Sequence, residues 1–434
     1  MGASDRSLAC RLMQSATAFP CRHIALAERV SWRTPAVILV CGCLVSLLGF
    51  GPRSALGFFL SPMSNANGWT REVFALALAI QALLWGAAQP FAGAMADRFG
   101  VGRVLCAGAA IYSLGLVAMA QSATPGALYV SAGLLIGFGL AGSSFTLVIG
   151  AFGALLPRQW RSLAFGAGTA AGSFGQFLFS PLAVASIDAF GWFTTLVLFG
   201  AAVLAIIPLS LALVAPRREE LKAPQAAIAT QQTLAQALTE AFSNRSYVLL
   251  VLGFFTCGFQ LFFITIHLPA YLMDRGLPAD VAGWTIATIG LFNIVGSICS
   301  GWLSSRVSNR WMLSAIYVAR AVAIMVFIAV PPTPAATLIF GAAMGLLWLS
   351  TVPPTSTLIV IMFGTRWLST LFGFAFFSHQ VGGFLGAWLG GLFFVRTGSY
   401  DAVWLVAILL GILSALINLP IVEKPTARLA GASA

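Results

Sequence analysis

The chain has 434 residues, of which 59% are hydrophobic and 8% are charged, and its formal net charge is +11. This balance excludes a water-soluble globular domain, so a soluble enzyme or binding module is ruled out and a membrane protein is indicated. The positive charge does not indicate nucleic-acid binding, because the basic residues lie between hydrophobic segments instead of forming a face in water.

Hydrophobic segments long enough to cross about 30 Å of hydrocarbon, roughly 20 residues each, recur along the whole chain. The strict two-residue alternation of a spanning barrel is absent, so we expect an all-α membrane protein. The sequence predicts about twelve transmembrane helices, at residues 35–62, 72–96, 103–121, 126–156, 163–186, 192–214, 246–272, 281–304, 311–330, 335–363, 367–394 and 401–420.

The longest polar interruption lies near the middle of the chain and leaves six spans on either side. We therefore predict an N-terminal tail at 1–34, a six-helix half at 35–214, a linker at 215–245, a second six-helix half at 246–420 and a C-terminal tail at 421–434. The segment GAMADRFGVGR at 93–103 has a weaker echo in GWLSSRVSNR at 301–310, at an offset of 208 residues. Duplication of a six-helix unit is typical of carriers that hold their substrate between two pseudo-symmetric halves.

The placement of lysine and arginine predicts the orientation in the membrane. With both termini in the cytoplasm, 18 of these residues fall on the inner side and 3 on the outer side. This asymmetry satisfies the positive-inside rule. The basic N-terminal tail lacks the apolar core and cleavage site of a signal peptide, so we expect a multi-pass protein of the cell inner membrane.

Small residues spaced four apart predict close helix crossings in two corresponding spans. They are Gly168 and Gly172 in the fifth span, and Gly382, Gly386 and Gly390 in the eleventh. Such spacing allows two helix backbones to approach within a membrane.

The loop after the second span carries Gly93, Asp97, Arg98, Gly100 and Arg103. This G-x-x-x-D-R-x-G-x-x-R pattern resembles the signature of the major facilitator superfamily. The motif is expected to form an inner gate, in which an aspartate accepts charge-assisted hydrogen bonds from basic groups or helix N-termini. The echo in the second half adds Arg306 to the predicted gating residues, whereas Gly102 stands where the family often has a second basic residue.

The stretch FGPRSALGFF around Arg53 resembles the first-span pattern of monocarboxylate transporters, with Arg53 in the place of their lysine. The fourth and fifth spans, GFGLAGSSFTLVIGAFGALLPRQWRSLAFGAGTAAGSFGQFLFSPL, also resemble that branch and the related oxalate/formate exchangers. The resemblance implies a major facilitator fold, a place for Arg53 in the substrate and proton pathway, and small organic anions as substrates. Asn293 and Ser297 depart from the acidic residue and arginine of this branch, and Val395 replaces an aspartate.

An arginine inside a span is expensive, about 2.5–3.5 kcal/mol at the helix centre, and suggests function by default. Its planar, permanently charged fork suits a carboxylate, so Arg53 is the leading candidate. Arg320 is also intramembrane, but a structural tie to a neighbouring helix is an equal expectation for it. The predicted substrate-binding residues are Arg53, Ser143, Ser144, Gln260, His267, Trp348 and His379. For the polar residues the alternative is an interhelical hydrogen bond without contact to substrate.

No nucleophile–base pair, phosphate-binding loop or metal-spaced cluster is found in the sequence, so we expect neither an enzyme nor a bound cofactor or metal. The predicted partners are a small organic anion and the lipid bilayer, with no nucleic acid and a monomeric state. Three forms of coupling stay open: a proton carried by His267 or His379, exchange for a counter-anion, or facilitated transport.

Two other functions remain open at this point. The 12% aromatic content is compatible with an exporter of hydrophobic or aromatic compounds. A membrane receptor that binds a metabolite without moving it is the other alternative, although neither the tails nor the linker is long enough for a large signalling domain.

Overall fold

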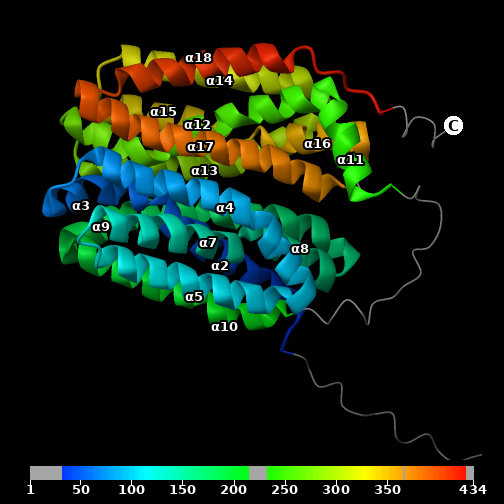
Figure 1. Cartoon of the computed structure of the whole chain (residues 1–434), viewed down its shortest axis with the longest axis horizontal. Coiled ribbons are helices and arrows are strands. Elements are labelled where there is room, and N and C mark those ends of the chain that lie inside the picture. The colour runs from blue at the N-terminus through cyan, green and yellow to red at the C-terminus, as the bar shows by residue number, and fades with distance from the viewer. Residues whose placement is uncertain (1–31, 215–231, 365–366, 427–434) are drawn as a thin grey trace, which may run out of the picture.

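The computed structural model describes residues 32–214, 232–364 and 367–426. The described chain is helical, and its long helices run side by side in two groups that follow the two halves of the sequence (Figure 1). The end of the bundle at which α2 (Pro35–Ser54) begins and α18 (Asp401–Asn418) ends is called the terminal face, and the other end the opposite face.

The N-terminal half contains α2, η1 (Leu56–Phe59), α3 (Leu60–Asn67), α4 (Arg71–Phe99), α5 (Val101–Ala120), α6 (Pro125–Leu128), the π-helical turn η2 (Tyr129–Leu135), α7 (Ile136–Gly142), α8 (Phe145–Leu155), α9 (Arg158–Leu204), α10 (Ile206–Ser210) and η3 (Leu211–Leu213). The helix α11 (Leu234–Ser243) lies in the predicted linker. The C-terminal half contains α12 (Arg245–Asp274), α13 (Ala279–Ser304), α14 (Asn309–Ala329), α15 (Pro334–Leu347), α16 (Val352–Phe363), α17 (Leu368–Thr397) and α18.

Ten helical segments of the described residues are long and apolar enough to cross a membrane. One of them, Ala164–Leu213, has 50 residues and bends at Gly191, whose positive φ of 77° breaks the helix, so it crosses twice. The 30-residue α17 packs along α4 and α12 and completes the twelve predicted spans. The protein is therefore an all-α membrane protein with the predicted six-plus-six arrangement.

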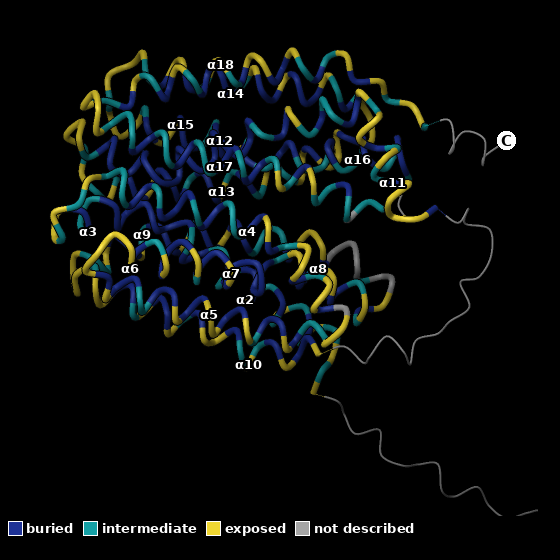
Figure 2. Tube along the Cα trace, in the orientation of Figure 1, coloured by how far each residue is buried: buried dark blue, intermediate teal, exposed yellow. Residues whose placement is uncertain are grey.

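Buried residues line the interior of each half and the surface between the halves, while exposed residues gather on the outer helix faces and at the loops (Figure 2). The halves meet through α4 against α17, α9 against α13, and η1 against α12. Because these pairs come from opposite halves, a side chain between them lies at the surface where the two halves meet.

Two spans are interrupted at corresponding positions. The fourth span breaks at Ser143 and Ser144, between α7 and α8, and the tenth breaks at residues 348–351, between α15 and α16. The helices after these breaks begin at Phe145 and Val352, 207 residues apart, which is within one residue of the 208 that relate the two sequence motifs. The duplication predicted from the sequence therefore extends to the irregular parts of the fold.

The glycine stripe of α17 lies against α12, as its spacing predicts. A methyl group at Gly382 would overlap the carbonyl oxygen of Phe255, and one at Gly386 would overlap that of Phe259. At Gly390 the added atom would overlap the ring of His267. In the fifth span the closest approach is made at Gly175, whose Cβ would lie 2.5 Å from the carbonyl oxygen of Leu47, whereas Gly168 and Gly172 leave more room.

At the terminal face, the chain after α18 closes over the start of α14. The Glu423 carboxylate accepts hydrogen bonds from the backbone N–H of Arg310 at 2.9 Å and from the Ser308 hydroxyl at 2.5 Å. Partial burial raises the pKa of Glu423, but these hydrogen bonds outweigh it and hold the pKa below its usual value. In the N-terminal half, Arg33 similarly donates to the carbonyl of Ala212 at the end of η3.

Replacing Gly382 with alanine is expected to destabilise the protein, because the methyl group would force α12 and α17 apart at a cost of about 1–3 kcal/mol. Gly373→Ala, in the same helix, serves as the matched control, since nothing lies within 4 Å of its added Cβ. Thermal unfolding in detergent would compare the two. An equal melting temperature for Gly382→Ala and wild type would contradict the close packing.

Replacing Glu423 with glutamine is expected to lower stability at neutral pH by about 0.3–1 kcal/mol, because a negative charge at a helix N-terminus is lost. The pKa of Glu423 is lowered in the folded state. Its charge therefore stabilises the fold fully when the pH is above the ordinary pKa of glutamate, and this stabilisation is lost as the pH falls through the lowered pKa. The difference in melting temperature between wild type and Glu423→Gln should therefore vanish in acid. Lys424→Gln is the control, and a difference that does not depend on pH would argue against the charged cap.

Candidate functional site

Arg53 lies at the end of α2, where the first span breaks before η1, and aromatic rings surround its charge. The guanidinium carbon lies 4.2 Å from the ring centre of Phe262, 5.0 Å from that of Trp85 and 5.6 Å from that of Phe50. Phe50 and Trp85 belong to the N-terminal half and Phe262 to α12 of the C-terminal half. The guanidinium therefore sits between the two halves.

The Arg53 guanidinium makes no hydrogen bond or ion pair with any residue that the structure describes. Its Nε atom is buried without a partner, although the side chain as a whole keeps part of its surface exposed. Cation–π contacts contribute about 0.5–2 kcal/mol each and offset part of the cost of a charge within a membrane. They leave the N–H donors without acceptors among the described residues. These donors are therefore open to an acceptor that the described residues do not supply.

A chain of hydrogen bonds leads from this site toward the terminal face. The indole N–H of Trp85 donates to Oε1 of Gln89 at 3.2 Å, and Nε2 of Gln89 donates to the hydroxyls of Ser144 at 2.9 Å and Thr146 at 2.6 Å. Ser144 and Thr146 lie directly after the break in the fourth span. The break thus exposes hydroxyl groups that fix Gln89, which in turn orients the Trp85 ring against Arg53.

His379 of α17 joins the same group of rings. It stacks on Phe376 with ring centres 5.7 Å apart and an interplanar angle of 7°, and Phe376 meets Trp85 edge to face at 5.7 Å. The His379 ring also lies 6.3 Å from that of Phe262. Of the predicted substrate-binding residues, the structure therefore brings Arg53, Ser144 and His379 into one connected group.

Arg320 has the opposite environment to Arg53. It is fully buried, and its guanidinium donates to the carbonyl oxygen of Leu347 at 3.1 Å from Nε, to that of Trp348, and to Oε1 of Gln260 at 3.4 Å. The two carbonyls lie at the end of α15, where the tenth span breaks and leaves them without helical partners. Arg320 thus caps a broken helix through its positive charge, which is the structural alternative expected for this residue.

Gln260 and Trp348 are directed into the C-terminal half in this structure. Besides accepting from Arg320, Gln260 donates from Nε2 to the carbonyl of Ala407 at 2.9 Å, and its side chain is fully buried. Trp348 is 2% exposed. Direct contact of either residue with a substrate stays a prediction, since the polar atoms of Gln260 are already bonded within the half.

The internal repeat explains why two arginines have such different roles. The offset of 208 residues relates Tyr112 of α5 to Arg320, and Arg53 aligns within one residue of Gln260. Arg320 of the third span bonds to Gln260 of the first span in the second half, and Tyr112 and Arg53 hold the equivalent positions in the first half. In the second half the charge is on the peripheral helix and is capped by carbonyls, whereas in the first half it is on the central helix and is unpaired.

His267 and Ser143 lie apart from the Arg53 group. His267 is fully buried and its Nε2 atom lies 2.7 Å from the carbonyl oxygen of Ala387, which requires the proton on Nε2. Its Nδ1 atom is buried without a partner. The Ser143 hydroxyl donates to the carbonyl of Gly139 at 2.7 Å within its own helix. A substrate role for these two residues stays a prediction.

Asn293, which replaces an acidic residue of the resembling family, ties the halves together. Its Nδ2 atom donates to the Ser173 hydroxyl of α9 at 2.8 Å, and its Oδ1 atom accepts from the Leu349 backbone at 3.0 Å and from Ser297 at 3.1 Å. A neutral amide can both donate and accept, so it links the fifth span to the break in the tenth without a buried charge.

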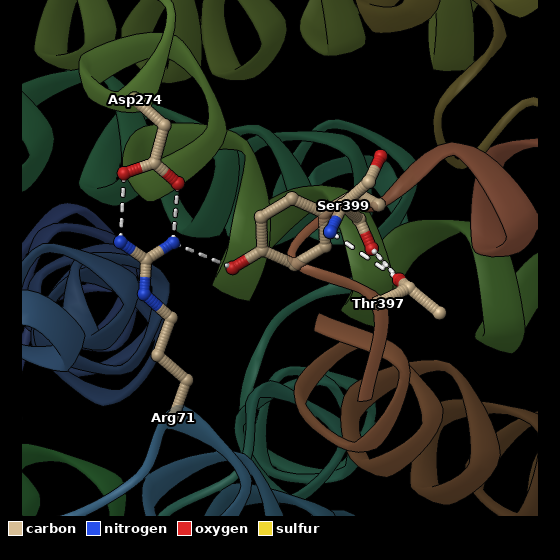
Figure 3. A network of polar contacts seen from close by, with 5 residues as sticks. Arg71, Asp274, Thr397 and Ser399 are labelled. Atoms are coloured by element: carbon tan, nitrogen blue, oxygen red, sulfur yellow. Dashed lines mark hydrogen bonds and ion pairs between the residues drawn. The ribbon is translucent and has the colours of Figure 1, made fainter. Parts of the chain in front are cut away.

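At the opposite face, a salt bridge joins the halves. Arg71, the first residue of α4, pairs with both carboxylate oxygens of Asp274 at the end of α12, the Nη2–Oδ1 distance being 2.7 Å (Figure 3). Arg71 also donates to the Tyr400 hydroxyl at 3.1 Å, directly after the turn formed by Thr397 and Ser399. These contacts join the two halves at the opposite face.

The predicted gating motif lies at the terminal face, between α4 and α5. Gly100 adopts a φ of 93° that favours glycine, Arg98 is exposed, and Arg103 donates to the carbonyl of Phe99 at 3.5 Å. Gly93 is half-buried, and Arg306 in the second half lies 4.0 Å above the Trp302 ring. The Asp97 side chain lies outside the part of the chain that is described, so the gating role of the motif stays a prediction.

Steric crowding explains why glycine stands at position 102, where this sequence departs from the family signature. A Cβ atom there would lie 2.8 Å from the Val214 side chain and 3.2 Å from the Ser210 carbonyl oxygen. The basic side chain that the family often carries at this position therefore does not fit against α10 and η3 in this conformation.

Sequence reasoning missed the aromatic residues around Arg53 and the Arg71–Asp274 pair. Single aromatic residues in apolar spans carry no positional signal, so Trp85, Phe262 and Phe376 were indistinguishable from core residues. Arg71 and Asp274 lie 203 residues apart at the ends of different spans, where charged residues are ordinary. The sequence signal for this pair is the repeat offset, which places Arg71 and Asp274 near the outer ends of their spans.

Comparison with known proteins agrees with these features. The family model described as Major Facilitator Superfamily matches residues 42–387 and 274–434. The chain is 28% identical to the MFS-type transporter YcxA of Bacillus subtilis over 387 residues, covering 87% of this chain and 92% of the relative. It is also 28% identical to human monocarboxylate transporter 11 over 353 residues, covering 78% of this chain and 71% of the relative.

Solved structures show the same fold. The D-xylose–proton symporter superposes with a TM-score of 0.68 at 16% identity, covering 90% of this chain and 97% of that one. A bacterial homologue of the human lysosomal transporter Spinster, in an inward-facing and occupied conformation, gives a TM-score of 0.70 at 13% identity, covering 88% and 96%. By its family model, its relatives and its two six-helix halves, this chain belongs to the Major Facilitator Superfamily and is a membrane transporter, not an enzyme.

Proposed function

We propose that the protein transports small organic anions of the monocarboxylate type by alternating access, with Arg53 as the anion-binding residue. The observation that carries the proposal is the Arg53 guanidinium, which lies between the halves without a hydrogen-bond acceptor among the described residues. A carboxylate matches its planar fork with two parallel hydrogen bonds. The similarity to monocarboxylate transporters supports the same substrate class.

The terminal face is proposed to be the cytoplasmic one, because it carries the positive excess found in the sequence. With the opposite face closed by Arg71 and Asp274, the substrate would reach Arg53 from the cytoplasmic side, along Gln89, Ser144 and Thr146. Anion binding would neutralise Arg53 and favour closure of the halves around it, which supplies the differential affinity that a conformational switch requires. We place the protein, as part of this proposal, in the cell inner membrane with both termini inside.

An exporter of neutral hydrophobic compounds is disfavoured by the same observation, because such a cargo would leave the Arg53 charge unpaired. The coupling stays open between proton symport, exchange of anions and facilitated transport. His379 lies among the rings near Arg53, whereas His267 lies nearer the Arg71 gate, with its ring tilted against that of Tyr400 at 5.2 Å.

Replacing Arg53 with glutamine is expected to reduce carboxylate uptake about 100-fold, because two charge-assisted hydrogen bonds to the anion are lost. Uptake of labelled lactate, pyruvate and larger carboxylates into proteoliposomes, with and without a pH gradient, provides the measurement. Arg396→Gln, an exposed arginine of α17, is the matched control. A response to the pH gradient would identify proton coupling, and uptake by Arg53→Gln equal to wild type would remove Arg53 from the site.

Reversing Asp274 to arginine is expected to reduce uptake by about fivefold or more, because the closed opposite face loses an ion pair worth about 1 kcal/mol and gains a repulsion. The double variant Arg71→Asp with Asp274→Arg should recover much of the loss by restoring the pair in reverse. Asp401→Asn is the control, since Asp401 faces Arg275 at 4.0 Å within the same half. No recovery in the double variant would mean that the pair does not close the gate.

A further inference from the structure

Resting on the proposed function, we propose that the Arg53 site selects anions that carry one negative charge on a flat apolar body, such as aryl monocarboxylates, over lactate-sized acids. Three features of the described residues carry this inference: the unused hydrogen-bond donors of Arg53, the charges around it, and the aromatic residues that surround it.

The donors of Arg53 are unused among the described residues. Its guanidinium carbon lies over the Phe262 and Trp85 rings, 4.2 and 5.0 Å from their centres, and its Nε donor is buried without a partner. The N–H donors of a guanidinium lie in one plane and match a planar carboxylate with two parallel hydrogen bonds. A carboxylate bound there places its substituent among the rings that surround Arg53.

The charge balance admits one anionic group. No described carboxylate pairs with Arg53, so the ammonium group of an amino acid would find no counter-charge there. The other deeply buried arginine, Arg320, is engaged by the carbonyls of Leu347 and Trp348, so a second carboxylate would find no free cation. A group without its opposite charge is costly in such a site, which disfavours both zwitterions and dianions.

The wall beyond the charge is aromatic across both halves. Trp85 meets Phe376 edge to face, Phe376 stacks on His379, and Phe254 lies 5.3 Å from His379. Rings are common in membrane helices for packing alone. These, however, connect α4 with α12 and α17 across the surface that must part during transport, and they converge on an unpaired cation. Aromatic pairs add to area burial in edge-to-face and offset geometries, so an aryl group gains contacts here that a methyl group cannot make.

The test is equilibrium binding of labelled benzoate and labelled L-lactate to the full-length protein in nanodiscs, which avoids passive flux of the acids through lipid. Benzoate is expected to bind at least tenfold more tightly than L-lactate. Unlabelled L-phenylalanine, a zwitterion, and phthalate, a dianion, are expected to compete at least tenfold less well than benzoate itself.

The variant Phe262→Leu keeps an apolar side chain and removes the ring, so benzoate affinity should fall about fivefold or more beyond any loss of L-lactate affinity. Phe190→Leu, at an exposed position with 62% of its surface accessible, is the matched control. If Phe262→Leu does not fold, as judged by size-exclusion chromatography, Phe376→Leu provides the same comparison.

The outcomes separate the inference from the proposed function. Lactate binding as tight as benzoate, or equal competition by phenylalanine or phthalate, would overturn the selectivity and leave anion transport standing. Absence of binding of either acid to folded wild-type protein would overturn both. Preference for benzoate that is lost in the ring variant and kept in the control would establish the aryl site.

Discussion

The unpaired charge of Arg53 is the constraint on which the organisation of this protein depends. A guanidinium inside a membrane bundle needs acceptors, and the two halves supply rings in their place. The rings stabilise the cation but leave its N–H groups available, which is the basis of the proposed anion site between the halves. The aromatic residues, the hydrogen-bonded chain to Ser144 and the position of His379 all follow from holding that charge without neutralising it.

Because of the internal duplication, the environment of Arg53 can be compared with that of Arg320 in the other half of the same chain. Each half breaks its fourth span at an equivalent point and places a polar pair between its first and third helices. In the C-terminal half the arginine of this pair fastens the broken helix through carbonyls at the end of α15, and Gln260 completes its bonds. In the N-terminal half the arginine is on the central helix, and Tyr112 occupies the peripheral position. The arginine of the second half is thus engaged by backbone carbonyls, whereas the donors of Arg53 are without acceptors among the described residues.

The contacts between the halves are distributed so that they can separate. The glycine-dependent crossing of α12 and α17 belongs to one half and is rigid, because backbone meets backbone there. Across the halves, the opposite face relies on Arg71 with Asp274 and Tyr400, and the middle on the neutral amide of Asn293. Ion pairs at a partly exposed position and single hydrogen bonds are weak enough to exchange for other partners, whereas glycine packing is not.

Much of the fold was determined by the sequence itself, because hydropathy, the position of the polar linker and the repeat of Gly93 at Gly301 depend on local composition and spacing. The sequence likewise singled out Arg53, since a charge inside an apolar span is visible without any partner. What surrounds that charge was decided by tertiary structure: Trp85, Phe262 and His379 come from three helices that only packing brings together. The same holds for Arg320 and Gln260, whose bonds to broken backbone could not be read from sequence, because a free carbonyl appears only where a helix has been interrupted.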